Sequence, residues 1–442
     1  MCNKIFSILS KLTPRSVTFT ILLNLLPLAC TQVESVEETQ ADEKTEEEAE
    51  IGPVSVTKSG ETNGGIQGAG ASGSGVSVAA KPTKVPTKRS DEDVGTEDGS
   101  NDSGGQVISD TPGNDEQNLV PQPASEWRSA LLSIPRIGAG AAFSGHKVHV
   151  LGGSANRDNV DVYDTRTKTW SVEARYNEGV WISSATVAGK AVYAGGDLGS
   201  GPSNRMLIYD GSNDTWSETI QPLGYFRSIA SVGEKVFMAG GMPVSGALFW
   251  TTLGSGSWSY KSSVARFHLS IAAAGGKVMF AGGILPNGSS CTNLIDIYDV
   301  ATDSWSTANL SSAKGFVGGV AARNLIFFAG GGCVGGESYN DVVDIYNTDT
   351  DSWSRARLSE ARYGVGAGVV GNKVVFAGGW GTEKGLSDTV DIYDLDSGNW
   401  STARLSVPRA HPTVASTGEE LLFIGGEGLN GSSSAVDIYS PR

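Results

Sequence analysis

The chain has 442 residues, 59 of them Gly, and a net charge of −15 at pH 7. Residues 31–126 hold 20 acidic and six basic residues and residues 1–30 hold three basic ones, so residues 127–442 have a net charge of only −4. A part with so little charge has no strong field to attract nucleic acid, which we exclude as a partner.

The first 29 residues have the pattern of an export signal. Three basic residues precede an apolar stretch over residues 16–28, which is too short for a membrane-spanning helix and is typical of a secretory signal peptide. The stretch ends in Pro27-Leu28-Ala29-Cys30, which resembles a bacterial lipobox, although Pro27 departs from the usual Leu. The resemblance implies that Cys30 receives a lipid. The alternative is an ordinary cleaved signal, which would give a secreted protein.

Residues 30–125 have the composition of a disordered tether. After Cys30 they contain no aromatic residue and a single Leu, and they run through Glu-rich, Gly/Ser-rich and Asp-rich blocks. Such a segment cannot bury enough apolar surface to offset the entropy lost on ordering. We therefore predict an anchor, a tether and a head. The outer membrane or the cell surface is favoured over the inner membrane, because Thr31 rather than Asp follows the Cys.

Residues 126–442 consist of copies of one pattern. Each of seven apolar runs of strand length ends in a diglycine, and in five copies a Tyr lies seven residues before a Trp. The second glycines are Gly153, Gly196, Gly241, Gly283, Gly331, Gly379 and Gly426, and the tryptophans are Trp127, Trp170, Trp216, Trp258, Trp305, Trp353 and Trp400. Repeats of this length indicate supersecondary units that bury a shared core.

The diglycine, Tyr and Trp of each copy resemble the kelch repeat. The resemblance implies an all-β fold, a seven-bladed β-propeller whose four-stranded blades have the diglycine at the end of the second strand, Tyr in the third and Trp in the fourth. Trp127 has no diglycine before it and Tyr439 has no Trp after it, so we predict that the Trp127 strand completes the last blade and closes the ring. Thr251 stands where the third blade should have its Tyr, so that blade is either repacked or specialised.

Loop lengths separate the scaffold from the candidate site. The spacing from the second Gly to the Tyr position varies between 10 and 15 residues, whereas the spacing from Tyr to Trp is constant at seven. In a propeller the variable loops share a face with the connections between blades, and loops on a rigid scaffold often carry function. We therefore expect the binding surface on this face.

Basic residues precede the innermost strands on the same face, 8 to 11 residues after a Trp, and Lys314 takes this place in the fourth blade. In kelch propellers similar to this one, such Arg residues approach the mouth of the central channel, and His268 and His411 should lie nearby. Guanidinium groups among aromatic rings suit an acidic peptide or an anionic glycan. The predicted binding residues are Arg136, Arg227, Arg266, Arg362, Arg409, Tyr363 and Trp380. The alternative is that these Arg side chains only satisfy neighbouring carbonyls and carboxylates.

No complete catalytic or metal-binding constellation is evident. His146 and His149 are three residues apart, which places them on opposite faces of a strand, and we expect no metal and no cofactor. Copper radical oxidases also have a kelch-like ring, but their paired His and Tyr ligands with a nearby Cys have no match here. Glu178 and Glu337 are candidates for acid–base work in a mutarotase-like enzyme. A sugar-acting enzyme is therefore the alternative function, and a purely structural envelope protein is the third.

Cys291 and Cys333 lie in the variable loops of the neighbouring fourth and fifth blades. An exported protein enters an oxidising compartment, so we predict a disulfide between these two loops. The sequence thus predicts a monomeric propeller, held at the membrane by a lipid, that binds a protein or glycan partner through the face with the variable loops.

Overall fold

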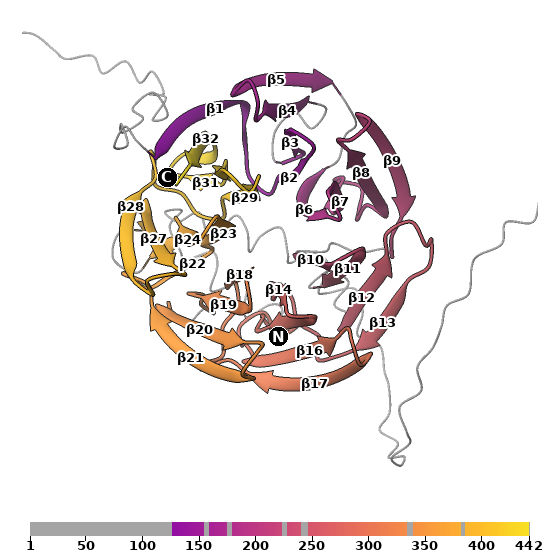
Figure 1. Ribbon diagram of the computed structural model, residues 1–442, viewed down its shortest axis with the longest axis vertical. Helices are drawn as coiled ribbons and strands as arrows, with labels where there is room; N and C mark the ends of the chain where they lie inside the picture. Colours follow the sequence, from indigo (N-terminus) through magenta and orange to yellow (C-terminus); the bar gives the residue numbers. More distant parts are fainter. Residues whose placement is uncertain are drawn as a thin grey trace, which may run out of the picture. The chain divides into compact units, whose positions relative to one another are not determined.

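The computed structural model describes residues 126–153, 159–174, 179–222, 228–239, 246–333, 339–381 and 385–441 (Figure 1). The predicted signal peptide, the lipidation residue Cys30 and the tether lie outside these ranges. Four other residues named above also lie outside them: Gly241, Arg227, Glu178 and Glu337.

Within these ranges all regular secondary structure is β-strand. Six of the sheets contain four antiparallel strands each. The first sheet contains β2 (Gly140–Ser144), β3 (Lys147–Leu151), β4 (Asn159–Asp164) and β5 (Thr169–Ala174). The second contains β6 (Val180–Val187), β7 (Lys190–Asp197), β8 (Arg205–Asp210) and β9 (Thr215–Ile220). The third contains β10 (Ser228–Val232), β11 (Lys235–Ala239), β12 (Ala247–Thr252) and β13 (Ser259–Ser262). The fourth sheet contains β14 (Ser270–Ala274), β15 (Lys277–Ala281), β16 (Leu294–Asp299) and β17 (Ser304–Asn309). The fifth contains β18 (Gly318–Ala322), β19 (Leu325–Ala329), β20 (Val342–Asn347) and β21 (Ser352–Arg357). The sixth contains β23 (Gly366–Val370), β24 (Lys373–Ala377), β27 (Thr389–Asp394) and β28 (Trp400–Arg404). The predicted all-β fold of four-stranded antiparallel sheets is confirmed.

One further large sheet joins strands from the two ends of the described chain. Its order is β29 (Thr413–Ser416), β30 (Leu421–Ile424), β32 (Gly431–Tyr439) and β1 (Trp127–Arg136), and β31 (Glu427–Gly428) pairs with β32. β1 runs antiparallel to β32 with Trp127 opposite Tyr439, and the centroids of these two rings are 4.7 Å apart. β1 is therefore the outer strand of this sheet.

A buried carboxylate connects this last sheet to the first one. Glu420 lies in the turn before β30 and is only 4% exposed. It accepts hydrogen bonds from the Arg128 guanidinium of β1 at 2.5 Å and from the Tyr163 hydroxyl of β4 at 2.9 Å. The Lys168 ammonium donates to it at 2.9 Å.

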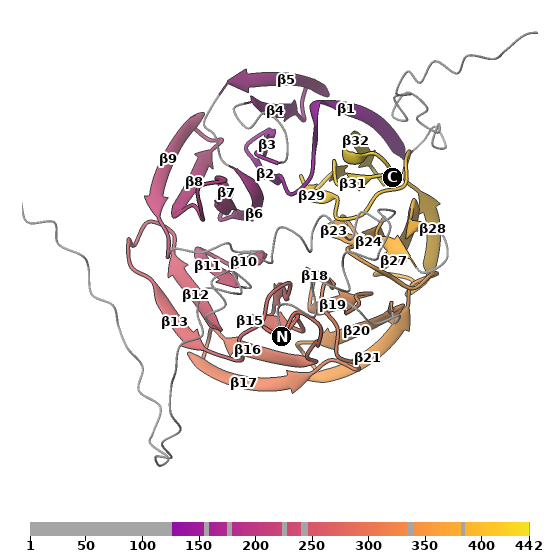
Figure 2. The ribbon, with the colours of Figure 1, turned by 180° about the vertical axis from the view of Figure 1, so that it is seen from behind.

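The innermost strands form an inner wall. β2, β6, β10, β14, β18, β23 and β29 each contact the next in this order, and β29 contacts β2. Figures 1 and 2 show the sheets arranged around this wall, with the fourth strand of each sheet outermost. A cavity of about 700 Å³ lies along the inner strands, and small side chains such as Ala185, Ala230, Ala272 and Ala321 line it.

The third sheet is repacked around its missing Tyr. Thr251 is buried in β12, and its hydroxyl donates a hydrogen bond to the Ser257 carbonyl at 2.5 Å. The neighbouring Trp250 packs against the next sheet, with ring centroids 5.5 Å from Tyr298 and 5.6 Å from Trp305. In this sheet the aromatic ring therefore comes from Trp250, one residue before the usual Tyr position, and it packs on the side that faces the next sheet.

A short three-stranded sheet lies on the face with the variable loops. It consists of β22 (Arg362–Tyr363), β25 (Trp380–Gly381) and β26 (Gly385–Leu386), with Tyr363 opposite Trp380. Gly379, just before β25, has a φ of +114°, and a Cβ there would lie 2.8 Å from the Tyr363 carbonyl oxygen. Close approach to the connection between two blades therefore requires this second glycine.

Candidate functional site

Basic side chains of the connections between blades lie inside the fold. Each forms an ion pair with an Asp in a third strand, or in β32 for the last sheet, and all ten side chains are buried. The nitrogen–oxygen distances are 2.8 Å for Arg136–Asp161, 2.6 Å for Arg266–Asp296, 3.0 Å for Lys314–Asp344, 2.6 Å for Arg362–Asp391 and 2.7 Å for Arg409–Asp437.

The repeat explains why each partner is an Asp at this place. The Asp lies two residues before the repeat Tyr, so both side chains leave the strand on the same face. Three of the Arg side chains also donate to the carbonyl of a Phe in the neighbouring second strand: Arg266 to Phe280 at 3.0 Å, Arg362 to Phe376 at 3.2 Å and Arg409 to Phe423 at 3.1 Å. Each of these three Arg side chains thus ties a connection to two strands of its sheet.

This geometry favours the structural role for Arg136, Arg266, Arg362 and Arg409. A buried guanidinium that pairs with a buried Asp has no route to a carboxylate on a ligand unless it leaves that Asp unpaired, which is costly. Burial lowers the pKa of Arg266 and of Lys314, and the paired Asp opposes the shift in both cases. The predicted binding residue Arg227 lies outside the described ranges.

The aromatic residues of the same face come together. The ring centroid of Tyr363 is 5.2 Å from Tyr339, 5.4 Å from Phe316 and 5.8 Å from His411. The His268 and Phe316 centroids are 4.0 Å apart. All five residues are part-exposed, and four of them directly precede the innermost strands β14, β18, β23 and β29. We call these five residues the mouth cluster.

The backbone holds the mouth cluster in a strained conformation. His268, Phe316 and His411 have φ values of 54°, 52° and 51°, in the left-handed region that residues with a side chain seldom adopt. Gly364 takes the same place in the intervening connection, with a φ of 66°.

Hydrogen bonds link these connections to one another. The Phe316 N–H donates to the His268 carbonyl at 3.1 Å, and the Gly364 N–H donates to the Phe316 carbonyl at 3.1 Å. The His411 N–H then donates to the Gly364 carbonyl at 2.8 Å. A continuous run of backbone therefore spaces the rings of the mouth cluster.

One carboxylate belongs to this surface. The Glu427 backbone pairs with Ala410, the residue before His411, through hydrogen bonds of 2.7 and 2.9 Å. Burial raises the pKa of Glu427, and among the described residues no side chain donates to its carboxylate or forms an ion pair with it. Burial, helped by Tyr339 and by the charge of Glu427, raises the pKa of Tyr363 to about 12.

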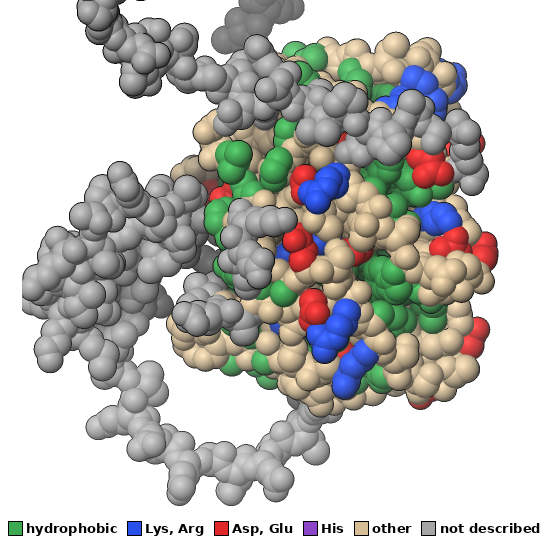
Figure 3. All heavy atoms as spheres, turned by 90° about the vertical axis from the view of Figure 1, so that its left-hand side faces the viewer, with side chains coloured by type: hydrophobic (Ala, Val, Ile, Leu, Met, Phe, Trp, Pro, Cys, Tyr) green, Lys and Arg blue, Asp and Glu red, His purple; other side chains and the backbone are tan. Residues whose placement is uncertain are grey.

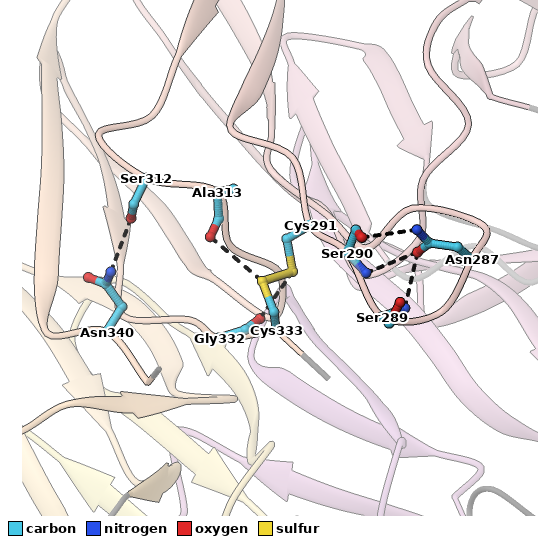
Figure 4. Close-up of a disulfide and its surroundings, with 9 residues drawn as sticks. All are labelled: Asn287, Ser289, Ser290, Cys291, Ser312, Ala313, Gly332, Cys333 and Asn340. Carbon is cyan, nitrogen blue, oxygen red and sulfur yellow. Dashed lines mark hydrogen bonds between the residues drawn. A yellow bond between two sulfur atoms is a disulfide. The ribbon is translucent and has the colours of Figure 1, made fainter. Parts of the chain in front are cut away.

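A disulfide joins Cys291 to Cys333, with the two Cα atoms 5.8 Å apart (Figure 4). It links the loop between β15 and β16 to the segment after β19, so it connects two neighbouring sheets on the variable-loop face. The Gly315 N–H donates to the Gly332 carbonyl at 3.0 Å, next to this bond. The disulfide therefore lies close to the connection that carries Phe316.

Charged side chains on the outer wall lie in pairs. Nη1 of Arg357 is 2.7 Å from Oδ1 of Asp341, and Nη1 of Arg404 is 2.6 Å from Oδ1 of Asp388. Figure 3, which shows one side of the molecule, has basic and acidic side chains next to one another. This side thus presents a mixed surface rather than a field of one sign.

In the described part of the chain, no group of three or more His, Cys, Asp or Glu side chains is arranged so that it could hold a metal ion. His149 is buried between aromatic rings, with centroids 4.2 Å from Tyr209 and 5.1 Å from Trp216. The described ranges also contain no helix that is long and apolar enough to cross a membrane.

Sequence reasoning did not single out Phe316, Tyr339 or Glu427. Phe316 was detectable, because it follows Lys314 by the same two residues that separate His268 from Arg266. Tyr339 comes from a loop of variable length, and nothing in its sequence neighbourhood indicates that it approaches Tyr363. Glu427 directly follows a diglycine, at the repeat position that Trp380 has opposite Tyr363, so the repeat places it opposite Ala410.

Comparison with known proteins agrees with this architecture. Residues 135–175 and 361–404 match the Kelch motif. Together with the four-stranded antiparallel sheets, these matches support a kelch-repeat β-propeller. Comparison with curated proteins gives no match to the chain.

Proposed function

We propose that this protein is a recognition module, a seven-bladed propeller closed by β1, that binds a partner protein through the face with the mouth cluster. The cluster itself carries the proposal, because it gathers five part-exposed rings on a fixed backbone. Aromatic side chains supply large contact areas and are enriched at the centres of protein interfaces. The Kelch motif matches support a protein-binding module of this kind.

The two ends of the sheets support this choice of face. On the opposite side, the turns between third and fourth strands repeat one arrangement, in which a side-chain oxygen accepts from the backbone N–H groups two and three residues later. This arrangement occurs at Asp164, Asp299, Asn347 and Asp394. The loops on the mouth-cluster side differ in length from sheet to sheet. Repeated turns on one side and loops of different length on the other are typical of a scaffold that has one recognition face.

Aromatic faces also stack on sugar rings, so a glycan is the second candidate ligand of this surface. A binding test therefore has to present both kinds of ligand. Purified full chain is screened against isolated envelope proteins and against a glycan array, in parallel with a Phe316→Ser/Tyr339→Ser double variant. We expect a protein partner whose affinity falls about tenfold or more in the double variant.

The matched control is Tyr260→Ser, which removes a ring that is 38% exposed on the outer strand β13. This variant should bind like the unmodified chain. Equal binding by all three proteins would contradict the proposed face, and binding to glycans alone would select the second candidate.

We further propose that the head is exported and attached to the cell envelope through a lipid on Cys30, at the outer membrane or the cell surface. The apolar stretch over 16–28, the lipobox-like residues 27–30 and the composition of 31–125 support this proposal. In the producing cell, the chain should be found in the membrane fraction and should be extracted from it by detergent. Cys30→Ser should release the chain from this fraction. A chain that stays in the membrane fraction after this substitution would exclude the lipid anchor.

A further inference from the structure

We propose that the mouth cluster and Glu427 together hold a positively charged lysine or arginine side chain of the partner protein. The inference rests on the proposed function and refines it by naming the chemistry of the contact. It reverses the expectation from the sequence, in which Arg residues of this face attract an acidic ligand.

The rings of the cluster offer the surface that a cation prefers. The Tyr363 ring has Tyr339 and Phe316 as neighbours, with centroids 5.2 and 5.4 Å away, and all three of these rings are part-exposed. The face of an aromatic ring carries partial negative charge and attracts an ammonium or guanidinium group within about 6 Å of its centroid. The long apolar stems of Lys and Arg also pack well against such rings.

Among the described residues, the charges around the cluster leave the Glu427 carboxylate without a counter-charge. Arg362 and Arg409 are paired with Asp391 and Asp437, so the basic groups of these connections are already neutralised. Glu360 accepts from Arg362 at 3.3 Å. By contrast, none of the described side chains forms an ion pair with Glu427 or donates to it.

The position of Glu427 brings its charge close to the central ring of the cluster. Its backbone pairs with Ala410, between Arg409 and His411, and its charge contributes to the raised pKa of the Tyr363 phenol. A partly buried carboxylate has lost solvation without gaining a partner, and a ligand cation would restore the lost interaction.

Other ligand charges fit this surface less well. An acidic group would meet both the Glu427 carboxylate and the negative faces of the Tyr and Phe rings. A neutral sugar would stack on the rings but would leave the Glu427 charge uncompensated. The observations therefore favour a cation over the acidic peptide and the glycan.

The experiment titrates the full chain with pentapeptides that have Lys, Arg or Glu between two Gly residues on each side, and separately with spermidine and N-acetylglucosamine. The chain has only four His, and two of them belong to the cluster, so the imidazole resonances of His268 and His411 report binding there. We expect saturable shifts with the Lys or Arg peptide that weaken about tenfold in Glu427→Gln.

Three further variants define the result. Glu419→Gln removes a carboxylate from the exposed turn before β30, at the other end of the sheets, and should leave the titration unchanged. Tyr363→Phe keeps the ring face and should bind, whereas Tyr363→Leu should not. Normal binding of the cationic peptides by Glu427→Gln would overturn the inference. Binding of spermidine without any binding of the Lys or Arg peptide would also overturn it.

The partner found in the binding screen separates this inference from the proposed function. Loss of partner binding in Phe316→Ser/Tyr339→Ser, together with full binding by Glu427→Gln, would keep the recognition face and reject the cation. Loss of partner binding in both variants, with Glu419→Gln unaffected, would support both proposals. Full partner binding by both variants would reject both.

Discussion

Arg409 and Asp437 form an ion pair in which Nη2 and Oδ2 are 2.7 Å apart and both side chains are completely buried. The same pairing of a connection with a strand recurs in four more sheets, one of them with Lys314 in place of Arg. Because each pair joins the end of one blade to the body of the next, these buried charges fix the path of the chain between blades.

Loss of one partner of this pair should destabilise the fold strongly. Arg409→Met would leave Asp437 as a buried carboxylate without its cation, a change that typically costs about 3–5 kcal/mol. Urea unfolding followed by tryptophan fluorescence measures this cost. The control is Arg357→Met, which breaks a pair with Asp341 but starts from a side chain that is 71% exposed, and it should cost less than about 1 kcal/mol. Equal losses in the two variants would contradict the structural role of the buried Arg.

The roles of these Arg residues show where sequence reasoning stops. The apolar runs that end in diglycines predict strands, and the resemblance of the diglycine, Tyr and Trp pattern to the kelch repeat implied the four-stranded sheets. The Asp partner is also visible, two residues before five of the six repeat Tyr residues, with Leu207 in this place before Tyr209. Whether Arg362 points toward that Asp or toward a ligand depends on the path of the connection, which the sequence does not encode locally. The resemblance to other propellers placed these Arg side chains at the mouth, whereas in this structure they are enclosed.

The mouth cluster was predictable only in part. His268 and His411 follow their Arg by two residues, so the repeat places them on the rim. Tyr339 reaches Tyr363 from a loop of the preceding sheet, across a separation that no repeat position specifies. Contacts between variable loops depend on loop conformations, and these are not set by hydrophobic periodicity.

Substitution of Gly379 should damage the site as well as the fold. Gly379→Ala places a Cβ 2.8 Å from the Tyr363 carbonyl oxygen at a φ of +114°, so the β22 backbone has to move. Gly371→Ala is the matched control, because its φ of +56° is also positive but no atom lies within 4 Å of the added Cβ. We expect a cost of about 1–2 kcal/mol for Gly371→Ala and clearly more for Gly379→Ala. Thermal unfolding of the two variants checks this order, and the reverse order would contradict the close approach.

Acid should weaken the side of the molecule opposite the mouth cluster. Hydrogen bonding from Lys190 lowers the pKa of Asp210 to about 2, and hydrogen bonding from Lys147 and Tyr209 lowers the pKa of Asp214 to about 2. Both folded-state pKa values lie below the ordinary value of 3.8. Between about pH 2 and pH 4 the unfolded chain therefore binds more protons than the folded chain. The stabilisation is therefore complete above about pH 4 and is lost as the pH falls toward 2.

Urea unfolding at a series of pH values between 2 and 6 tests this dependence. Asp210→Asn and Asp214→Asn should each flatten the fall in stability at low pH, and the double variant should flatten it most. A double variant with an unchanged pH profile would show that other carboxylates control acid unfolding.

Cleavage of the disulfide should loosen the connection beneath Phe316. The loop closed between Cys291 and Cys333 has a sequence separation of 42 residues, for which chain entropy gives at most about 4 kcal/mol of stabilisation. In a Cys2→Ser/Cys30→Ser background only these two Cys remain, because the chain has four Cys in all. Thiol titration of this protein after denaturation without a reductant should find no free thiol, and two thiols would contradict the bond. A reductant should then lower the free energy of unfolding, and it should have no such effect after Cys291→Ser/Cys333→Ser.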